Sequence, residues 1–141
     1  MTTTMPPDLD TAAAVLDWTR ARRADADRAE ADLLRAAVRW SDLHPAESIH
    51  DAAVMERFGD QAIAIAGPGA PLVSEFAVAE FASAMKLPTL VGAQQLGEAL
   101  ELHYRLPRTW ARVDAGDLPG WRGRRIARET ICLTREAAAY V

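Results

Sequence analysis

The sequence predicts an all-α fold, in which a long N-terminal helix is followed by an orthogonal multi-helix bundle that contains a helix-turn-helix-like pair. Three observations support this fold class. Half of the residues are hydrophobic, but many of these are alanine, which favours helices. Capping residues and prolines divide the chain into segments of helical length. A single segment, AIAIAG from Ala62, suggests a strand, and the sequence offers it no partner strand.

The first predicted helix begins at a cap provided by Asp10 or Thr11 and ends near Leu43. It stops there because proline disfavours helix in the preceding residue, and Pro45 follows His44. At 1.5 Å per residue its length is on the order of 50 Å. The large apolar side chains lie towards its two ends, and its middle contains only alanine and charged residues. The middle is therefore predicted to be solvated, or to pack against an alanine-rich helix of another chain.

The connection between this helix and the rest of the chain is predicted to be irregular. Ser48 and Asp51 resemble a capping box for a short helix that ends near Gly59. Between Gly67 and Pro71, two glycines and two prolines exclude regular structure. The predicted organisation is a disordered segment at 1–9 and one helical domain at 10–141, divided into a long helix (10–44), the connection (45–71) and a helical core (72–141).

The helical core is predicted to contain five helices. They run from Leu72 to Lys86 with Pro71 at the first helical position, from Leu90 to Arg105 with Thr89 as its cap, from Pro107 to Ala115, from a cap at Asp117 to about Thr130, and onwards from Thr134. The core face of the second of these helices is formed by Ala93, Leu96, Leu100 and Tyr104. Its exposed face is predicted to carry Glu98 and Glu101, two carboxylates that oppose binding to phosphates.

The first two helices of this core are similar to a helix-turn-helix of the kind found in sigma-factor-like DNA-binding proteins. Ala82 occupies the close-packed position and Leu96 the inner side of the second helix, although Lys86 replaces the usual turn glycine. In such a motif the second helix reads base edges in the major groove. Gln94 and Gln95 are therefore candidates for base contacts.

Charge is distributed unevenly along the chain, whose net charge is −4. Residues 1–100 carry 8 basic and 15 acidic side chains, whereas residues 101–141 carry 8 basic and 5 acidic ones. We define the arginine band as Arg122, Arg124, Arg125 and Arg128; it follows Arg105, Arg108 and Arg112 in the sequence. Trp110 and Trp121 lie among these arginines, where they either stack on unpaired bases or anchor the core. The arginines either contact phosphates or pair with acids of the long helix such as Asp25, Asp27, Glu30 and Asp32.

The sequence predicts no catalytic site, no cofactor, no metal site and no small-molecule substrate. The three histidines, His44, His50 and His103, lie far apart, and the chain has no asparagine, so an HNH nuclease site is excluded. His103 is expected to be partly buried. Cys132 is the single cysteine and is expected to be buried. A cytoplasmic location without a membrane partner is predicted, because the chain lacks both a signal peptide and a run of about 18 apolar residues.

The stretch from Gly67 to Val141 contains GPGAPLVSEFAVAEF, then GEALELHYRLPRTWARVDAGDLPGWRGRRIA, then LTREAAAYV. In these three segments and in their order, the chain resembles the 13E12-repeat family of high-GC, actinobacterial species, also called domain of unknown function 222. Its members often carry an HNH nuclease module after this helical region. The resemblance implies a nucleic-acid-related role, in which the helical region positions DNA and the arginine band contacts phosphates.

Two functions are therefore considered for this chain. The first is a non-catalytic domain that binds or positions DNA. The second is a protein–protein interaction or dimerisation module, in which the long helix and an open C-terminal edge recruit another chain; a truncated remnant without independent function belongs with this alternative. Apolar surface is expected at Trp121, Ile126, Leu133 and Tyr140, because the last helix would normally pack against further residues. Such a surface predicts self-association or a missing C-terminal partner domain.

Overall fold

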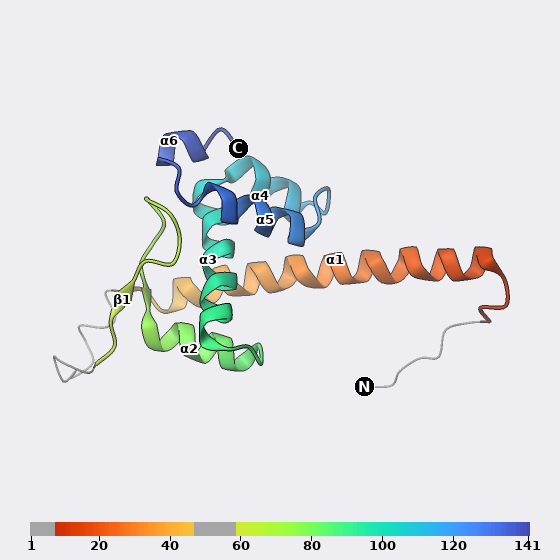
Figure 1. The fold of residues 1–141 in the computed structure, drawn as a ribbon, viewed down its shortest axis with the longest axis horizontal. Helices are drawn as coiled ribbons and strands as arrows, with labels where there is room; N and C mark the ends of the chain where they lie inside the picture. The colour runs from red at the N-terminus through yellow and green to blue at the C-terminus, as the bar shows by residue number, and fades with distance from the viewer. Residues whose placement is uncertain (1–7, 47–58) are drawn as a thin grey trace.

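The computed structural model describes residues 8–46 and 59–141. The fold is mainly all-α, as predicted, with a long N-terminal helix followed by a multi-helix packing (Figure 1). The elements are α1 (Ala12–Leu43), β1 (Ala62–Ile63), β2 (Val73–Ser74), α2 (Glu75–Ala84), α3 (Thr89–Arg105), α4 (Pro107–Asp114), α5 (Gly120–Thr130) and α6 (Arg135–Ala138). The predicted capping box at Ser48 and Asp51, and most of the predicted disordered segment at 1–9, lie outside the described residues.

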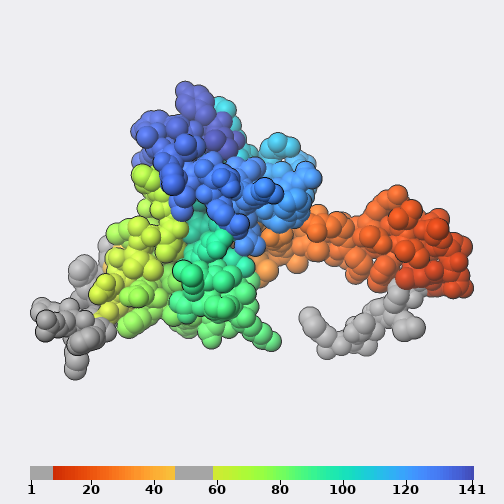
Figure 2. Space-filling model, viewed as in Figure 1, coloured from red at the N-terminus to blue at the C-terminus, as the bar shows by residue number. Residues whose placement is uncertain are grey.

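Helix α1 has two halves in different surroundings. It begins where the sequence predicts, because the hydroxyl of Thr11 accepts a hydrogen bond of 3.1 Å from the backbone nitrogen of Ala14. Its C-terminal half joins the core through Ala31, Leu34, Ala37, Val38 and Ser41. None of residues 12–29 is buried, but most of residues 24–29 line hollows that they share with the core. Residues 12–23, which we call the arm, project from the body of the molecule (Figures 1 and 2). The predicted solvated middle is therefore present in the structure of the single chain.

Helix α3 is the centre of the core and contacts α1, α2, α4 and α5. Leu96 and Leu100 are fully buried, as predicted, but Tyr104 is 38% exposed. Glu98 and Glu101 were expected on an exposed face, and this expectation is wrong, since they are 4% and 0% exposed. The reason is that helices pack around the second half of α3, where residues 96–102 are all buried and no exposed face remains.

Helices α2 and α3 have the geometry of a helix-turn-helix. They meet at 102° across residues 85–88, within the range of that motif. A Cβ atom on Gly92 would lie 2.3 Å from Cβ of Ala82, so the helices approach more closely than a larger residue allows. Lys86 has a φ of 56°, the left-handed conformation that the usual turn glycine adopts readily. Pro88 is the N-cap of α3, and Thr89, predicted as the cap, is its first residue.

Two boundaries of the core differ from the prediction for identifiable reasons. Helix α2 begins at Glu75 and not at Leu72, because residues 73 and 74 form β2, which pairs antiparallel with β1 of the AIAIAG segment. The expectation that this segment has no partner is therefore wrong, and Pro71 lies before the helix. Helix α5 begins at Gly120 after Pro119, so Asp117 does not cap it. Cys132, expected to be buried, is exposed.

A buried ion pair joins three separate segments of the core. The side chains of Glu101 and Arg105 form this pair and are both 0% exposed. The backbone nitrogen of Gly67 donates to Glu101 at 2.9 Å, and Arg105 donates to the carbonyl oxygens of Ile131 and Leu133. A Cβ atom on Gly67 would lie 1.7 Å from Nη1 of Arg105, so glycine is required there. The pair thus ties the glycine-rich loop and the α5–α6 connection to α3.

Candidate interaction surfaces

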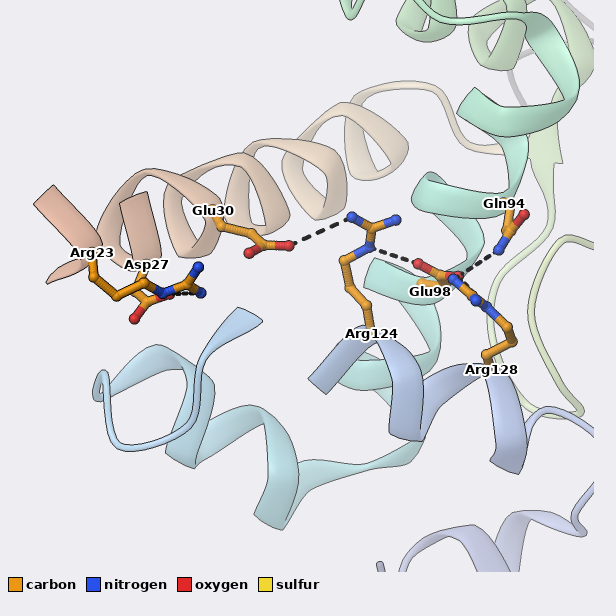
Figure 3. Close-up of polar contacts among 7 residues, drawn as sticks. All are labelled: Arg23, Asp27, Glu30, Gln94, Glu98, Arg124 and Arg128. Atoms are coloured by element: carbon orange, nitrogen blue, oxygen red, sulfur yellow. Dashed lines mark hydrogen bonds and ion pairs between the residues drawn. The ribbon is translucent and has the colours of Figure 1, made fainter. Parts of the chain in front are cut away.

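The arginine band is divided into an internally paired half and an exposed half. Arg124 and Arg128 belong to the paired half and turn towards Glu98 of α3 (Figure 3). Nε of Arg124 lies 2.7 Å from Oε2 of Glu98, and Nη2 of Arg128 lies 2.7 Å from Oε1. Nη1 of Arg124 also lies 3.5 Å from Oε1 of Glu30 on α1. These two arginines therefore connect α5 to α3 and α1.

Glu98 is the acceptor at the centre of this network. Gln94 donates to it from Nε2 at 2.9 Å, in addition to the two arginines. Burial alone would raise the pKa of the Glu98 carboxyl. The hydrogen bonds from Gln94, Arg124 and Arg128 outweigh burial, and the pKa lies below its ordinary value of 4.5. The carboxylate is thus held ionised by its partners, and it neutralises the charge that these arginines would offer to phosphates.

The exposed half of the arginine band consists of Arg122 and Arg125. Within residues 8–46 and 59–141 neither forms an ion pair. The Arg122 guanidinium lies 5.1 Å from the ring centroid of Trp121, which is itself 44% exposed. An open and mostly apolar hollow of about 510 Å³ lies beside them. We call its lining the α5 patch and define it as Leu118, Trp121, Arg122, Arg125, Ile126 and Glu129.

The other arginines predicted to bind nucleic acid do not extend this surface. Arg105 is buried in the ion pair with Glu101 and is unavailable to any ligand, so its prediction as a contact residue is wrong. Sequence periodicity could not reveal this, although the spacing of four residues between Glu101 and Arg105 is typical of an ion pair on a helix. Arg108 is exposed at the start of α4, with its Nη1 atom 3.4 Å from the backbone oxygen of Tyr140.

The two glutamines predicted to contact bases lie on α3 but face its neighbours. Gln94 is exposed, and its amide is bound to Glu98. Gln95 is half-buried and lines a groove between α1 and α2. The structure therefore does not bring the eight predicted residues into one surface. Their separation follows from the central position of α3.

The acids of α1 do not cover the arginine band, with one exception. Asp27 pairs with Arg23 of the same helix (Figure 3), and Asp32 pairs with Arg35 at 2.5 Å. Asp25 likewise binds arginines of α1. Only Glu30 among the four reaches the band. Of these acids only Glu30 pairs with the arginine band, through Arg124. The other ion pairs of the band join Arg124 and Arg128 to Glu98.

The start of α1 forms a second surface without a partner. Val15 and Leu16 are 41% and 54% exposed. Asp8 and Asp10 lie just before the helix, and within the described part of the chain neither has a basic partner. The pKa of Asp10 lies above its ordinary value of 3.8. The main cause is a hydrogen bond with the neighbouring Asp8 carboxyl, and desolvation is a smaller one. We call Asp8, Asp10, Val15 and Leu16 the arm tip.

Some classes of site have no counterpart in the described structure. No group of three or more histidine, cysteine or acidic side chains within residues 8–46 and 59–141 could hold a metal ion. His44 lies at the end of α1, His103 is exposed and not partly buried, and His50 lies outside the described residues. No single described helix is long and apolar enough to cross a membrane; α2 and α3 reach that length and hydropathy only together, across their 102° bend.

Comparison with family models, with curated proteins and with solved structures found no match to this chain.

Proposed function

We propose that this chain is a protein–protein association module without catalytic activity, in which the arm contacts another chain. One observation carries the proposal. A helical stretch of 12 residues, 12–23, projects from the body with no residue buried and with exposed apolar side chains at Val15 and Leu16. Isolated helices of this length are only marginally stable in water. A partner that covers the apolar side chains would stabilise the arm.

The geometry gives less support to sequence-specific DNA reading. The second half of α3 is mostly buried, and its exposed first turns carry Leu90, Val91 and Gln94, of which only Gln94 can hydrogen-bond to a base edge. Arg105 is unavailable, and Glu98 neutralises much of the charge of Arg124 and Arg128. Affinity for DNA depends chiefly on free positive charge, and the net charge of this chain is −4.

A second candidate function, the binding of single-stranded nucleic acid, is favoured by one observation. Trp121 is exposed beside Arg122 and Arg125, and an aromatic ring next to free guanidinium groups can stack on a base. The proposed membership of the 13E12-repeat family would add to this candidate. We further propose a cytoplasmic location, which rests on the sequence alone.

Sedimentation velocity of the full chain over a range of concentrations tests the association function. The wild type is expected to self-associate, and a Val15→Glu/Leu16→Glu variant to sediment as a monomer, because two charges replace the apolar surface of the arm. Leu90→Glu is the matched control, since Leu90 is 82% exposed on α3, away from the arm, and should leave association unchanged. A wild type that remains monomeric up to about 1 mM would contradict self-association through the arm.

A further inference from the structure

Within residues 8–46 and 59–141, the two surfaces defined above have no partner, and their charges are opposite. The α5 patch is an apolar hollow with two unpaired arginines at its edge, Arg122 and Arg125. The arm tip combines exposed apolar side chains with two unpaired acids, Asp8 and Asp10. The two surfaces therefore have opposite charges, and both have apolar area that a contact between them would cover.

The two surfaces cannot meet within one molecule. Gly120, at the start of α5, lies against Glu30, where a Cβ atom on the glycine would be 2.8 Å from Cγ of the glutamate. From Glu30 back to Val15 the helix extends about 22 Å at 1.5 Å per residue. Helix α1 is continuous over this distance, so the arm tip is held away from the patch (Figure 1).

We propose that the arm tip of one copy of this chain docks on the α5 patch of a second copy. In this contact Val15 and Leu16 cover the hollow beside Trp121, and Asp8 and Asp10 pair with Arg122 and Arg125. The inference rests on the proposed association function and names the surface that receives the arm. Because each copy has both surfaces, two copies can exchange arms reciprocally and form a closed dimer, the commonest form of homo-oligomer.

The charges of the two surfaces support this pairing. Asp8 and Asp10 lie beside each other without a cation in the described part of the chain, and the hydrogen bond with Asp8 raises the pKa of Asp10. A guanidinium group can bind a carboxylate through two parallel hydrogen bonds, and such charge-assisted bonds are stronger than neutral ones. The contact would therefore give both acids of the arm tip a cationic partner and both arginines an anionic one.

A nucleic acid fits the α5 patch less well than the arm tip does. The hollow is mostly apolar, whereas a phosphate backbone requires a continuous positive surface. Glu129 lies in the lining, and the neighbouring Arg128 is paired with Glu98. The Arg122 guanidinium already lies over the Trp121 ring, where a base would stack.

Substitutions that reverse the charges of the α5 patch and of the arm tip test the proposal. Arg122→Glu/Arg125→Glu and Asp8→Arg/Asp10→Arg should each weaken self-association of the full chain by at least about tenfold in sedimentation equilibrium, because like charges then face each other. A chain with all four substitutions should recover association, since its basic tip meets an acidic patch. Arg39→Glu/Arg112→Glu is the matched control: both residues are exposed and outside the two surfaces, and this variant should associate as the wild type does. Circular dichroism checks that every variant is folded.

Each result supports or overturns the inference. The inference is supported if self-association is weakened in Arg122→Glu/Arg125→Glu and in Asp8→Arg/Asp10→Arg and is recovered in the chain with all four substitutions. If Val15→Glu/Leu16→Glu abolishes association but Arg122→Glu/Arg125→Glu does not change it, the arm docks elsewhere, and the inference fails while the association function stands. A monomeric wild type overturns both. If the patch variant loses only the binding of a labelled single-stranded oligonucleotide, the patch is a nucleic-acid site and the inference is wrong.

Discussion

At the scale of single residues, Glu98 links three helices through its hydrogen bonds. It receives Gln94 from its own helix and two arginines from α5, and one of these arginines continues to Glu30 on α1. Three helices are thus joined through one buried carboxylate. Its charge is required because a buried acceptor facing guanidinium groups stabilises the fold mainly when it is ionised.

Glu98→Gln should lower the free energy of unfolding by about 1–2 kcal/mol at pH 7, because a neutral amide replaces the charged acceptor of two partly exposed arginines. The folded-state pKa of Glu98 lies below 4.5, so its contribution is fully present above that pH and is lost as the pH falls through the lower folded-state value. Wild type and variant should therefore converge in acid. Urea unfolding at pH 7 and below pH 4.5 measures this, and Glu80→Gln, at an exposed site on α2, is the control. An unchanged difference across this range would contradict the assignment.

Tyr104 forms a second link between α3 and α1 that depends on protonation. Its hydroxyl donates to Oδ1 of Asp42 at 2.5 Å. This hydrogen bond, then burial and the nearby negative charge, raises the pKa of Tyr104 to about 12. The protonated phenol is therefore favoured in the folded protein. The stability that it contributes is present below pH 10 and is lost as the pH rises towards 12.

Tyr140→Phe leaves Tyr104 as the only tyrosine, so its phenolate absorbance can be followed directly. The midpoint of the titration should lie at about 12. Adding Asp42→Ala should move this midpoint towards the ordinary value of 10.0, because both the acceptor and the charge are removed. Equal midpoints in the two proteins would mean that the Tyr104–Asp42 hydrogen bond is absent in solution.

At the scale of elements, helix α1 has two parts that differ in their stability against unfolding. Its C-terminal half is covered by the core, whereas the arm is stabilised chiefly by ion pairs within the helix, such as Arg20–Asp17 and Arg22–Asp25. Exposed pairs of this kind contribute only about 0.3–0.5 kcal/mol each. The arm should therefore open without unfolding the rest of the molecule.

Hydrogen exchange should reveal this gradient along α1. In dilute protein, backbone amides of residues 16–23 should exchange by local opening, whereas those of Leu34 to Ser41 and of α3 should exchange only on global unfolding. The same amides of the arm should become protected at high concentration if the arm docks on another copy. Uniform protection along α1 at every concentration would contradict the division into two halves.

At the scale of the whole molecule, the sequence predicts the order and nature of the helices better than their surroundings. Caps and prolines are local signals, so the limits of α1 and α4 agree closely with prediction. The β1–β2 pair was missed because its partners are separated along the chain and each has only two residues.

The burial of Glu98, Glu101 and Arg105 could not be predicted for a related reason. Burial depends on which helix becomes central, and periodicity on a single helix cannot reveal how many neighbours it has. The candidate surface was therefore predicted only in part. Arg122 and Arg125 are exposed, which was one of the two alternatives for the arginine band, whereas the sequence divides the arm tip between the predicted disordered segment 1–9 and the long helix.

The buried pair of Glu101 and Arg105 has a consequence for synthesis on the ribosome. Arg105 is satisfied partly by the carbonyl oxygen of Leu133, which is translated much later than α1 and α3. Until Leu133 is synthesised, the guanidinium group lacks one of its acceptors, which makes closing the core around Arg105 less favourable. The apolar face of α1, with Leu34 and Val38, is likewise not fully covered until α5 has been synthesised.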